Sequence, residues 1–233
     1  MEDKKRISAE IINQYTGLDT PSITDAMDRL GLTGGLLGIG SVVRGTKLCG
    51  QAFTVHYTSC GQVHGTVGDF LDDVEPGEVV VIDNGGRLHC TVWGDIMSFY
   101  ASTKGIAGTV IDGVCRDVPT IEQLKYSIFT KGTHMVTGKD RVYVDGVNVP
   151  VSVSNVQVLP GDLMVADDSG AVVVPRSHVE AVLKVALEIA QKEEFIREEI
   201  RKGGSLKEAR ERSGYHHLQS REAGINKEGE ERD

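Results

Sequence analysis

Apolar runs of strand length alternate with segments of helical character through the middle of this 233-residue chain. The runs lie at residues 79–83, 107–112 and 127–131, and the segments between them, 92–103 and 119–125, have helical spacing or helix-start signals. Strands that are apolar throughout are typical of a sheet covered on both faces by helices. The alternation therefore predicts an α/β fold.

Further elements are predicted before this region. Residues 48–58 are rich in β-branched and aromatic residues and indicate a strand, and apolar residues recur at helical spacing from position 63 to position 74. Nearer the N-terminus, Thr20 and Pro21 are typical of a helix N-cap and a first helical position, and Gly31 is typical of the end of that helix. The expected order is therefore helix, strand and helix before the first apolar run.

The second half of the chain changes from alternation to hairpins. Residues 141–148 and 149–158 predict short strands joined by the Asp145-Gly146 turn, a common hairpin signal. Residues 163–166 and 171–174 flank the polar turn Asp167-Asp168-Ser169-Gly170 and predict a second hairpin. Together with the alternating half, these hairpins predict a mixed sheet layered with helices.

A long helix is predicted after the hairpins. Ser177 and Glu180 form a capping box, and apolar residues continue at helical spacing behind them. We expect this helix to end near Arg201, because two glycines follow.

The last part of the chain is dominated by charge. From Gln191 onward, 21 of 43 residues are acidic or basic. Ser205 is expected to cap one more short helix, and the segment from about His216 is expected to be mobile in a monomer. We therefore divide the chain into a domain of residues 1–204 and a charged C-terminal extension of residues 205–233.

Composition disfavours two kinds of partner. Asp and Glu outnumber Lys and Arg by 34 to 25, a net charge of −9, so no basic field is present to hold nucleic acid. The apolar runs are far shorter than the roughly 20 residues that span a bilayer, and no apolar segment follows the charged N-terminus as in a secretory signal. We therefore expect a cytoplasmic protein without nucleic-acid or membrane partners. The cysteines expected to be reduced and mostly packed are Cys49, Cys60, Cys90 and Cys115.

Two loops at the carboxyl ends of predicted strands carry polar residues. One loop leads from a pair of glycines to Asp95, the other runs from Asp112 to Asp117, and ligands of open α/β sheets gather at such ends. The three aspartates offer carboxylates for a hard divalent cation, and Arg116 offers a guanidinium for a carboxylate or an enolate. On chemistry alone, the same residues also suit helix caps and surface ion pairs.

Asp95 is followed, after twenty residues, by Arg116-Asp117 within the segment GDIMSFYASTKGIAGTVIDGVCRD. This segment resembles the signature of the class II pyruvate aldolases that cleave 4-hydroxy-4-methyl-2-oxoglutarate and 4-carboxy-4-hydroxy-2-oxoadipate, and of the RraA-like superfamily around them. The segments TPSITDAMDRL, GQAFTV, PGEVVVIDNGG and PGDLMVADDSGAVVVP resemble the same family, so the resemblance covers residues 20–205. It implies the RraA-like fold, an α/β/β/α sandwich with mixed sheets and a long C-terminal helix.

The resemblance implies a role for each residue of the signature. Asp117 would contact Mg²⁺ or Mn²⁺, with Asp95 holding a water bound to the metal, and Arg116 would bind the pyruvyl carbonyl and stabilise its enolate. The amides of Ile96 and Met97 would receive the pyruvyl carboxylate, a role that suits a helix N-terminus. The implied substrate-binding set is Gly94, Asp95, Ile96, Met97 and Arg116.

In the family, a glutamate from the C-terminal helix of a neighbouring subunit completes the site. The segment KEEFIREEIRKGGSL resembles that region, and we favour Glu193, four residues before Arg197, over Glu194. The resemblance thus implies a homotrimer or a dimer of trimers with the active site at the subunit interface. The helix residues expected to be buried against the neighbour are Phe195, Ile196 and Ile200.

One departure from the family concerns the distal side of the pocket. Where many family aldolases have a Pro-Gly-Asp-Asn turn, this chain has Ser59-Cys60-Gly61-Gln62. The departure leaves open the identity of the substrate beyond its pyruvyl half. His64 nearby could bind a distal carboxylate, or it could cap or pack a helix.

The implied reaction is cleavage of the C3–C4 bond of a 4-hydroxy-2-oxo di- or tricarboxylic acid. A base removes the C4 hydroxyl proton, and pyruvate leaves as an enolate held by the metal and Arg116. Oxaloacetate decarboxylation would pass through the same enolate. The alternative from a different class is a non-enzymatic RraA-type regulator of ribonuclease E, which acts by protein contact and needs neither metal nor Glu193.

Overall fold

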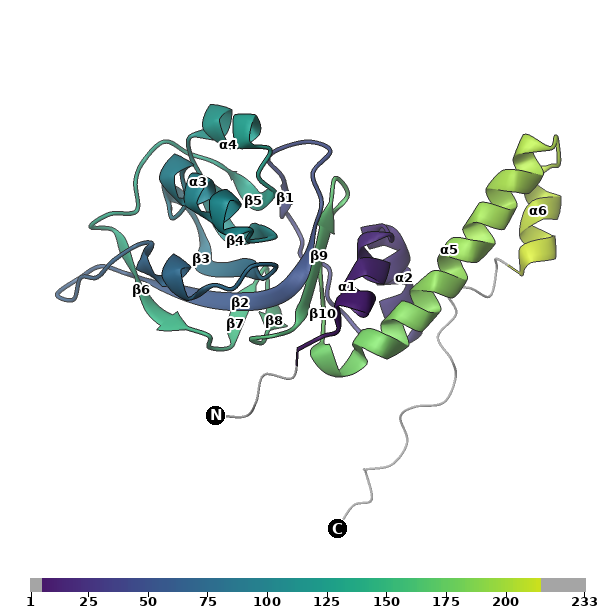
Figure 1. The fold of residues 1–233 in the computed structure, drawn as a ribbon, viewed down its shortest axis with the longest axis horizontal. Coiled ribbons are helices and arrows are strands. Elements are labelled where there is room, and N and C mark those ends of the chain that lie inside the picture. The colour runs from purple at the N-terminus through teal and green to yellow at the C-terminus, as the bar shows by residue number, and fades with distance from the viewer. Residues whose placement is uncertain (1–5, 215–233) are drawn as a thin grey trace, which may run out of the picture.

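The computed structural model describes residues 6–214 and has the mixed α/β fold expected from the sequence (Figure 1). Its main sheet has eight strands; seven follow the order β1-β5-β4-β3-β2-β9-β10, and β6 pairs with β2. Strands β2 to β5 run parallel to one another, and the other pairings are antiparallel. The strand bounds are β1 Gly40–Ser41, β2 Leu48–Ser59, β3 Val79–Thr91, β4 Gly108–Cys115, β5 Ile128–Thr133, β6 Val142–Val147, β9 Leu163–Asp167 and β10 Gly170–Val174.

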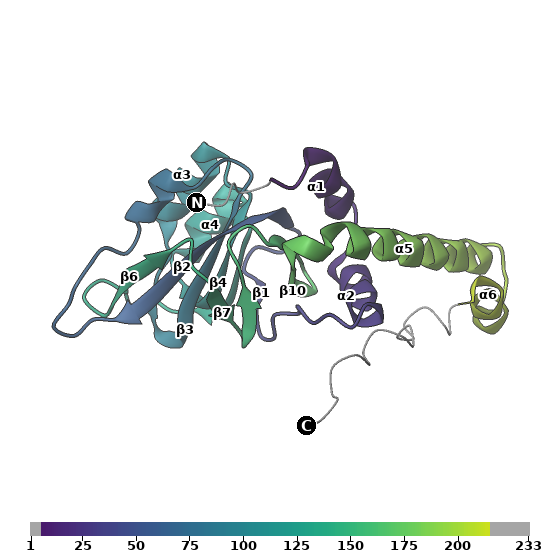
Figure 2. The ribbon, with the colours of Figure 1, turned by 90° about the horizontal axis from the view of Figure 1, so that it is seen from below.

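Helices lie on both sides of the strands (Figures 1 and 2). Helices α3 (Asp95–Lys104) and α4 (Val118–Leu124) cover the parallel strands, whereas α1 (Ala9–Thr16), α2 (Thr20–Arg29) and α5 (Val179–Arg201) pack against β9 and β10. The last turns of α5 project away from the sheet, and α6 (Leu206–Ser213) folds back beside them. None of the helices in the described residues has the length and apolar character that a bilayer span requires.

Three groups of buried side chains separate the layers. The first lies between the parallel strands and helices α3 and α4, and includes Phe53 and Ile82. The second includes Phe129 and Met164, and lies between the opposite face of those strands, β9 and β10, and a separate hairpin of β7 (Val151–Val153) and β8 (Val156–Val158). The third joins β9 and β10 to α1, α2 and α5. The resulting order is helix, sheet, sheet, helix, as the resemblance implies.

Strand β2 belongs to both halves of the sheet. On one edge, residues 52–56 pair with β3, and on the other edge residues 48–51 pair with β9 and residues 55–59 pair with β6. The two ends of the sheet are joined by the segment before β2, because Gly35 bridges Val172 of β10 and β1 pairs with β5.

The prediction of a helix over residues 63–74 is wrong. The structure has a loop followed by a 3-10 helix over Asp69–Asp73. Glycines 65 and 68 interrupt the segment, and its carbonyls are used by neighbours instead of by a helix: Thr66 accepts from the Val144 amide, and Val67 accepts from the Tyr57 hydroxyl. Phe70 is still buried in the first group of side chains. The apolar spacing of this segment therefore predicts its buried side chains correctly, although it predicts the wrong secondary structure.

The prediction of a hairpin turn at Asp145-Gly146 is also wrong. Both residues lie within β6, which pairs with β2, and the hairpin forms later, between β7 and β8. Its two turn residues, Ser154 and Asn155, have φ values of 50° and 64°, the left-handed pair that a two-residue type I′ hairpin turn requires. The second predicted hairpin, from β9 to β10, is confirmed.

The helix ends differ from the predicted caps. Asp19, not Thr20, caps α2 by accepting from the Ser22 amide, because Thr20 is engaged by the Asp167 carboxylate. The capping box of Ser177 and Glu180 does not form: a 3-10 turn over Arg176–His178 precedes α5, and the Ser177 hydroxyl contacts the ring of His178.

Other sequence-based predictions agree with the structure. Helix α5 ends at Arg201, and Ser205 caps α6 by accepting from the Glu208 amide. The segment from His216 lies outside the described residues. All four cysteines are free, and Cys90 and Cys115 are buried, with burial raising the pKa of the Cys115 thiol to about 11. Helix α1 was not anticipated, although Ser8 caps it.

Candidate active site

The start of α3 forms one side of the candidate site. The helix predicted from residue 92 begins instead at Asp95, because Trp93 is fixed in the core: its ring stacks on Tyr126, and its Nε1 donates to the Ser98 hydroxyl at 2.8 Å. That hydroxyl donates in turn to the Gly94 carbonyl at 2.8 Å. The first turn of α3 is thereby held rigidly at the carboxyl end of β3.

The loop after β4 forms the second side. The Arg116 amide donates to the Trp93 carbonyl at 3.1 Å, which joins this loop to the start of α3. Asp117 has left-handed backbone angles, φ 59° and ψ 37°, uncommon for a residue that is not glycine. This conformation turns its carboxylate towards α3, where Oδ2 accepts from the Asp95 amide at 3.2 Å and lies 3.3 Å from Nε of Arg116. The structure therefore brings together the signature residues Asp95, Arg116 and Asp117.

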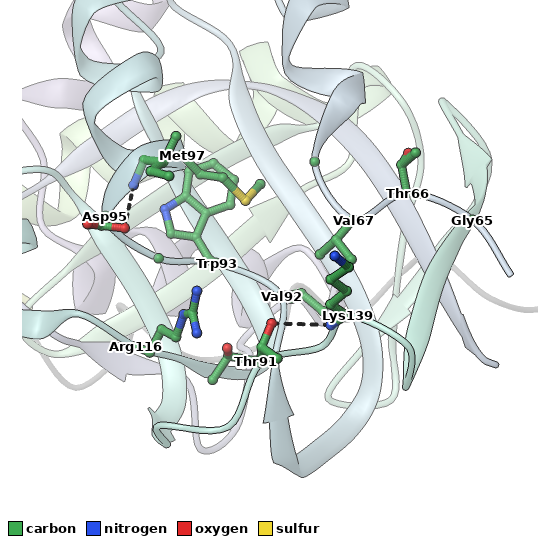
Figure 3. A pocket seen from close by; sticks show the side chains of 14 residues that line it. Gly65, Thr66, Val67, Thr91, Val92, Trp93, Asp95, Met97, Arg116 and Lys139 are labelled. Atoms are coloured by element: carbon green, nitrogen blue, oxygen red, sulfur yellow. Dashed lines mark hydrogen bonds between the residues drawn. The ribbon is translucent and has the colours of Figure 1, made fainter.

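A cavity of about 440 Å³ opens in front of this junction (Figure 3). Asp95 and Arg116 line it, and Asp117, which is not among the lining residues, contacts the Asp95 amide and the Arg116 guanidinium. Figure 3 shows Asp95 and Lys139 on opposite sides of Trp93. The lining residues are Gly65 to Gly68, Thr91 to Met97, Arg116, Thr137 and Lys139.

Ile96 and Met97 occupy the second and third positions of α3, where amides lack partners within the helix. The Ile96 amide donates to Oδ1 of Asp95 at 2.8 Å in this structure. A substrate carboxylate bound at this helix end would have to take over that amide from Asp95. The side chains of Ile96 and of Phe99 are exposed, at 78% and 62%, so this face of α3 is not part of the chain's own core.

Asp112 does not belong to the cluster of carboxylates predicted for the site. Its side chain lies on the opposite face of β4, where it pairs with Lys131 and accepts from the Ser154 amide at 3.1 Å. Asp83 plays the same part on β3 by accepting from the Ser152 amide at 3.0 Å. Side chains alternate between the faces of a strand, so these two aspartates anchor the β7–β8 hairpin.

Glu193 and Glu194 lie on α5, which Figure 1 shows on the far side of the sheet from α3. Glu193 pairs with Arg197 at 2.8 Å, and Glu194 pairs with Arg197 and Arg201. Hydrogen bonds from the two arginines lower the pKa of Glu194. Within residues 6–214, no hydrogen bond or ion pair joins either glutamate to a residue that lines the chain's own cavity. Three apolar residues of α5 are expected to be buried against a neighbouring subunit. Ile196 is already buried within the chain, and Phe195 and Ile200 are part-exposed.

The turn that departs from the family pattern is held by arginines. The Ser59 hydroxyl accepts from Arg87 at 3.1 Å, and the Cys60 amide donates to the Arg141 carbonyl at 2.8 Å. His64 is exposed and directly precedes the lining segment that begins at Gly65.

Lys139 and the threonine at position 137 line the cavity and were not anticipated. They come from the loop between β5 and β6, and no periodicity or motif in that loop marks them. A parallel bridge between Thr91 and Thr137 brings the loop to the site, and a backbone bridge of this kind leaves no signal in the side-chain pattern.

Metal donors at the cavity are few. The described residues contain no group of three or more His, Cys, Asp or Glu side chains placed to hold an ion. Asp95 and Asp117 supply two carboxylates, a donor set that suits Mg²⁺, which keeps several waters and commonly uses one or two carboxylates.

The chain is similar to known proteins over most of its length. A family model described as RraA-like, Aldolase/RraA, matches residues 20–173. Protein DlpA of Legionella pneumophila is 36% identical over 204 residues, which are 86% of this chain and 33% of DlpA, so the chain spans about a third of that relative's length.

Two further relatives are similar over most of their own length. A protein of Halalkalibacterium halodurans named "Putative 4-hydroxy-4-methyl-2-oxoglutarate aldolase" is 34% identical over 177 residues, covering 76% of this chain and 82% of that protein. The crystal structure of Streptomyces coelicolor RraAS2, described as an unusual member of the RNase ES inhibitor RraA protein family, matches with a TM-score of 0.75 and 31% identity. That match covers 83% of this chain and 98% of the other.

Proposed function

Because the chain belongs to the RraA-like family of aldolases and RraA proteins, we propose that it is a divalent-metal-dependent aldolase. Its substrate would be a 4-hydroxy-2-oxo di- or tricarboxylic acid, which it cleaves to pyruvate and a second oxo acid. The same site would decarboxylate oxaloacetate, because both reactions release pyruvate as an enolate.

The observation that carries the proposal is the junction of Asp95, Arg116 and Asp117 at one cavity. Arg116 has a planar fork of donors that can hold the carbonyl oxygen of a 2-oxo acid and the negative charge that grows on it during bond cleavage. The amides that begin α3 would receive the carboxylate next to that carbonyl. Asp95, half-buried at the cavity wall, can accept a proton or orient a water beside the reacting carbon.

Asp117 and Asp95 are the residues that would hold Mg²⁺ or Mn²⁺. A bound ion would supply Lewis-acid stabilisation of the enolate. Asp117 is already oriented by the Asp95 amide and by Arg116, so its carboxylate is held in place by this chain's own groups.

A neighbouring subunit would supply Glu193, in a homotrimer or a dimer of trimers. The support is the placement of α5, whose last turns project from the sheet with Phe195 and Ile200 part-exposed (Figure 2). A projecting helix with this many charged residues buries little apolar surface within its own subunit, so little stabilises it there. Burial of those two side chains against another copy would stabilise it.

A second function has one observation in its favour, the likeness to RraAS2, whose description names an inhibitor family of RNase ES. In that case the chain would act as a regulator of ribonuclease E through protein contact, without turnover of a small molecule.

One experiment separates the two functions. Purified protein is assayed for pyruvate release from oxaloacetate and from a panel of 4-hydroxy-2-oxo acids, first with Mg²⁺, then with excess EDTA, then with Mn²⁺ added back. We expect pyruvate release that EDTA abolishes and either ion restores. Full activity in EDTA would reject the metal-dependent mechanism. Absence of pyruvate release, together with inhibition of ribonuclease E, would establish the regulator instead.

A further inference from the structure

Two cationic side chains reach the cavity from separate loops, and among residues 6–214 only one of them has an anionic partner. Arg116 lies 3.3 Å from Oδ2 of Asp117. Lys139 lines the same cavity, and within the described part of the chain no ion pair is found for its ammonium group. Figure 3 shows its side chain extending beside Val67, away from Asp95. The cavity therefore has one cation within the signature cluster and a second cation outside it.

The loop that carries Lys139 is fixed in place. The Thr91 amide donates to the Val136 carbonyl at 2.9 Å, and the Lys139 amide donates to the Thr137 hydroxyl at 3.2 Å. Arg141 closes the loop by donating to the carbonyls of Thr137, at 3.2 Å, and of Lys139, at 3.5 Å.

Gly138 shows how closely this loop is packed. A β-carbon at this position would collide with the Thr91 carbonyl oxygen, and it would lie 3.0 Å from Val142. The loop is therefore seated directly on the end of β3. Because Thr91 is two residues before Trp93, the backbone at Lys139 is held in a constant relation to the start of α3.

The surroundings of Lys139 favour an anion. Val67, Val92, Trp93 and Met97 are the apolar side chains of the same cavity, and Lys139 is an exposed residue of its lining that is free to turn towards a ligand. An ammonium group is a compact point charge that suits a carboxylate. A ligand whose 2-oxo acid end lies on Arg116 and the α3 amides would extend along these apolar side chains towards Lys139.

We propose that Lys139 binds a second carboxylate of the substrate and so makes this site selective for 2-oxo acids that carry a distal acidic group. This inference rests on the proposed function, because the pyruvyl end must occupy the Arg116 side. Lys139 is then a specificity-determining residue, and Thr137 is a positioning residue for the loop that carries Lys139.

The test measures binding of two inert acids by isothermal titration calorimetry in the presence of Mg²⁺. 2-Oxoglutarate has a distal carboxylate, and 2-oxopentanoate has the same carbon count without one. We expect wild-type protein to bind 2-oxoglutarate at least about tenfold more tightly. The Lys139→Met variant should lose most of that preference with 2-oxopentanoate unchanged, and Lys139→Arg should retain it. Lys184→Met, at an exposed position on α5, is the control for the same change in net charge.

The outcomes separate this inference from the proposed function. If 2-oxopentanoate binds and Lys139→Met leaves the preference unchanged, or weakens both acids equally, the distal subsite is wrong and the pyruvyl site stands. If wild-type protein binds neither acid, the pyruvyl site and the subsite are both rejected. In turnover assays with a cleavable diacid, Lys139→Met should raise KM about five- to tenfold with kcat little changed, whereas a structural role would lower kcat or the melting temperature.

Discussion

A β-carbon at position 94 would lie 2.6 Å from Oδ2 of Asp117, so Gly94 leaves the space that the Asp117 carboxylate occupies. The same added carbon would lie 3.3 Å from Nε of Arg116. Since φ at Gly94 is −152°, an extended value that any residue adopts, the requirement for glycine here is one of space and not of backbone conformation.

We predict that Gly94→Ala displaces Asp117 and Arg116 and lowers kcat/KM at least about tenfold, or roughly 1.4 kcal/mol of transition-state stabilisation. The melting temperature should change little, because both displaced side chains are part-exposed. Gly40→Ala is the matched control, since a β-carbon there meets nothing within 4 Å. Equal activity in the two variants would show that the position of Asp117 is unimportant for turnover.

Arg116→Lys should lower kcat at least about tenfold, because a lysine keeps the charge and loses the planar pair of donors. Initial rates of pyruvate release at saturating substrate measure this effect. Arg44→Lys, at an exposed position, controls for the same exchange elsewhere. A near-normal kcat would remove Arg116 from the mechanism.

The shared site can be tested by mixing two inactive variants. Asp117→Ala and Glu193→Ala subunits should each be inactive alone, and mixed oligomers should regain part of the activity, because some sites combine an intact Asp117 with an intact Glu193 from the neighbour. Energy transfer between labelled subunits verifies that exchange occurs. Exchange without recovered activity would contradict the shared site. If Glu193→Ala subunits are active alone, and inactive Glu194→Ala subunits regain activity when mixed with Asp117→Ala subunits, Glu194 is the residue that completes the site.

Asp167 should make stability depend on pH. Burial acts to raise its pKa, but hydrogen bonds from the amide and hydroxyl of Thr20 and from the Ser169 amide outweigh burial, so the pKa lies below its usual range. The ionised form therefore stabilises the folded state above a pH of about 4, the pKa of an unfolded aspartate, and this contribution disappears as the pH falls through the lowered value.

We predict that Asp167→Asn lowers the free energy of unfolding at pH 7 by about 1–3 kcal/mol, a typical cost for losing hydrogen bonds to a buried charge. Urea unfolding at pH 7 and near pH 3 should show the difference from wild type shrinking at the lower pH. Asp168→Asn, the exposed neighbour in the same turn, should have a smaller effect at both pH values. A difference that grows on acidification would contradict the lowered pKa.

The parallel strands and the signature cluster could be predicted because their causes lie in the local sequence. Val79 to Ile82 are all fully buried, and such a strand must be apolar at every position. Arg116 and Asp117 directly follow the buried strand β4, so adjacency along the chain places them at the carboxyl edge of the sheet.

The remaining features depend on contacts between distant segments. Lys139 reaches the cavity through backbone hydrogen bonds to Thr91, which any residue types could make. The closeness of Asp112 to Arg116 in sequence predicts that both belong to the site, whereas the alternation of side chains in β4 places Asp112 on the opposite face. Thr20 has a good N-cap side chain, but Asp167, distant in sequence, engages it.

The position of β2 at the centre of the sheet has a consequence for synthesis on the ribosome. Leu48 pairs with Ala166, and Ser59 pairs with Val142, so this strand emerges about 80 to 120 residues before its antiparallel partners. Pairings between such distant segments close slowly, and an unpaired apolar edge can meet other chains in the meantime. The growing chain would therefore expose one edge of β2 until translation is nearly complete, and a nascent chain stalled before residue 142 should bind chaperones more strongly than one released after residue 174.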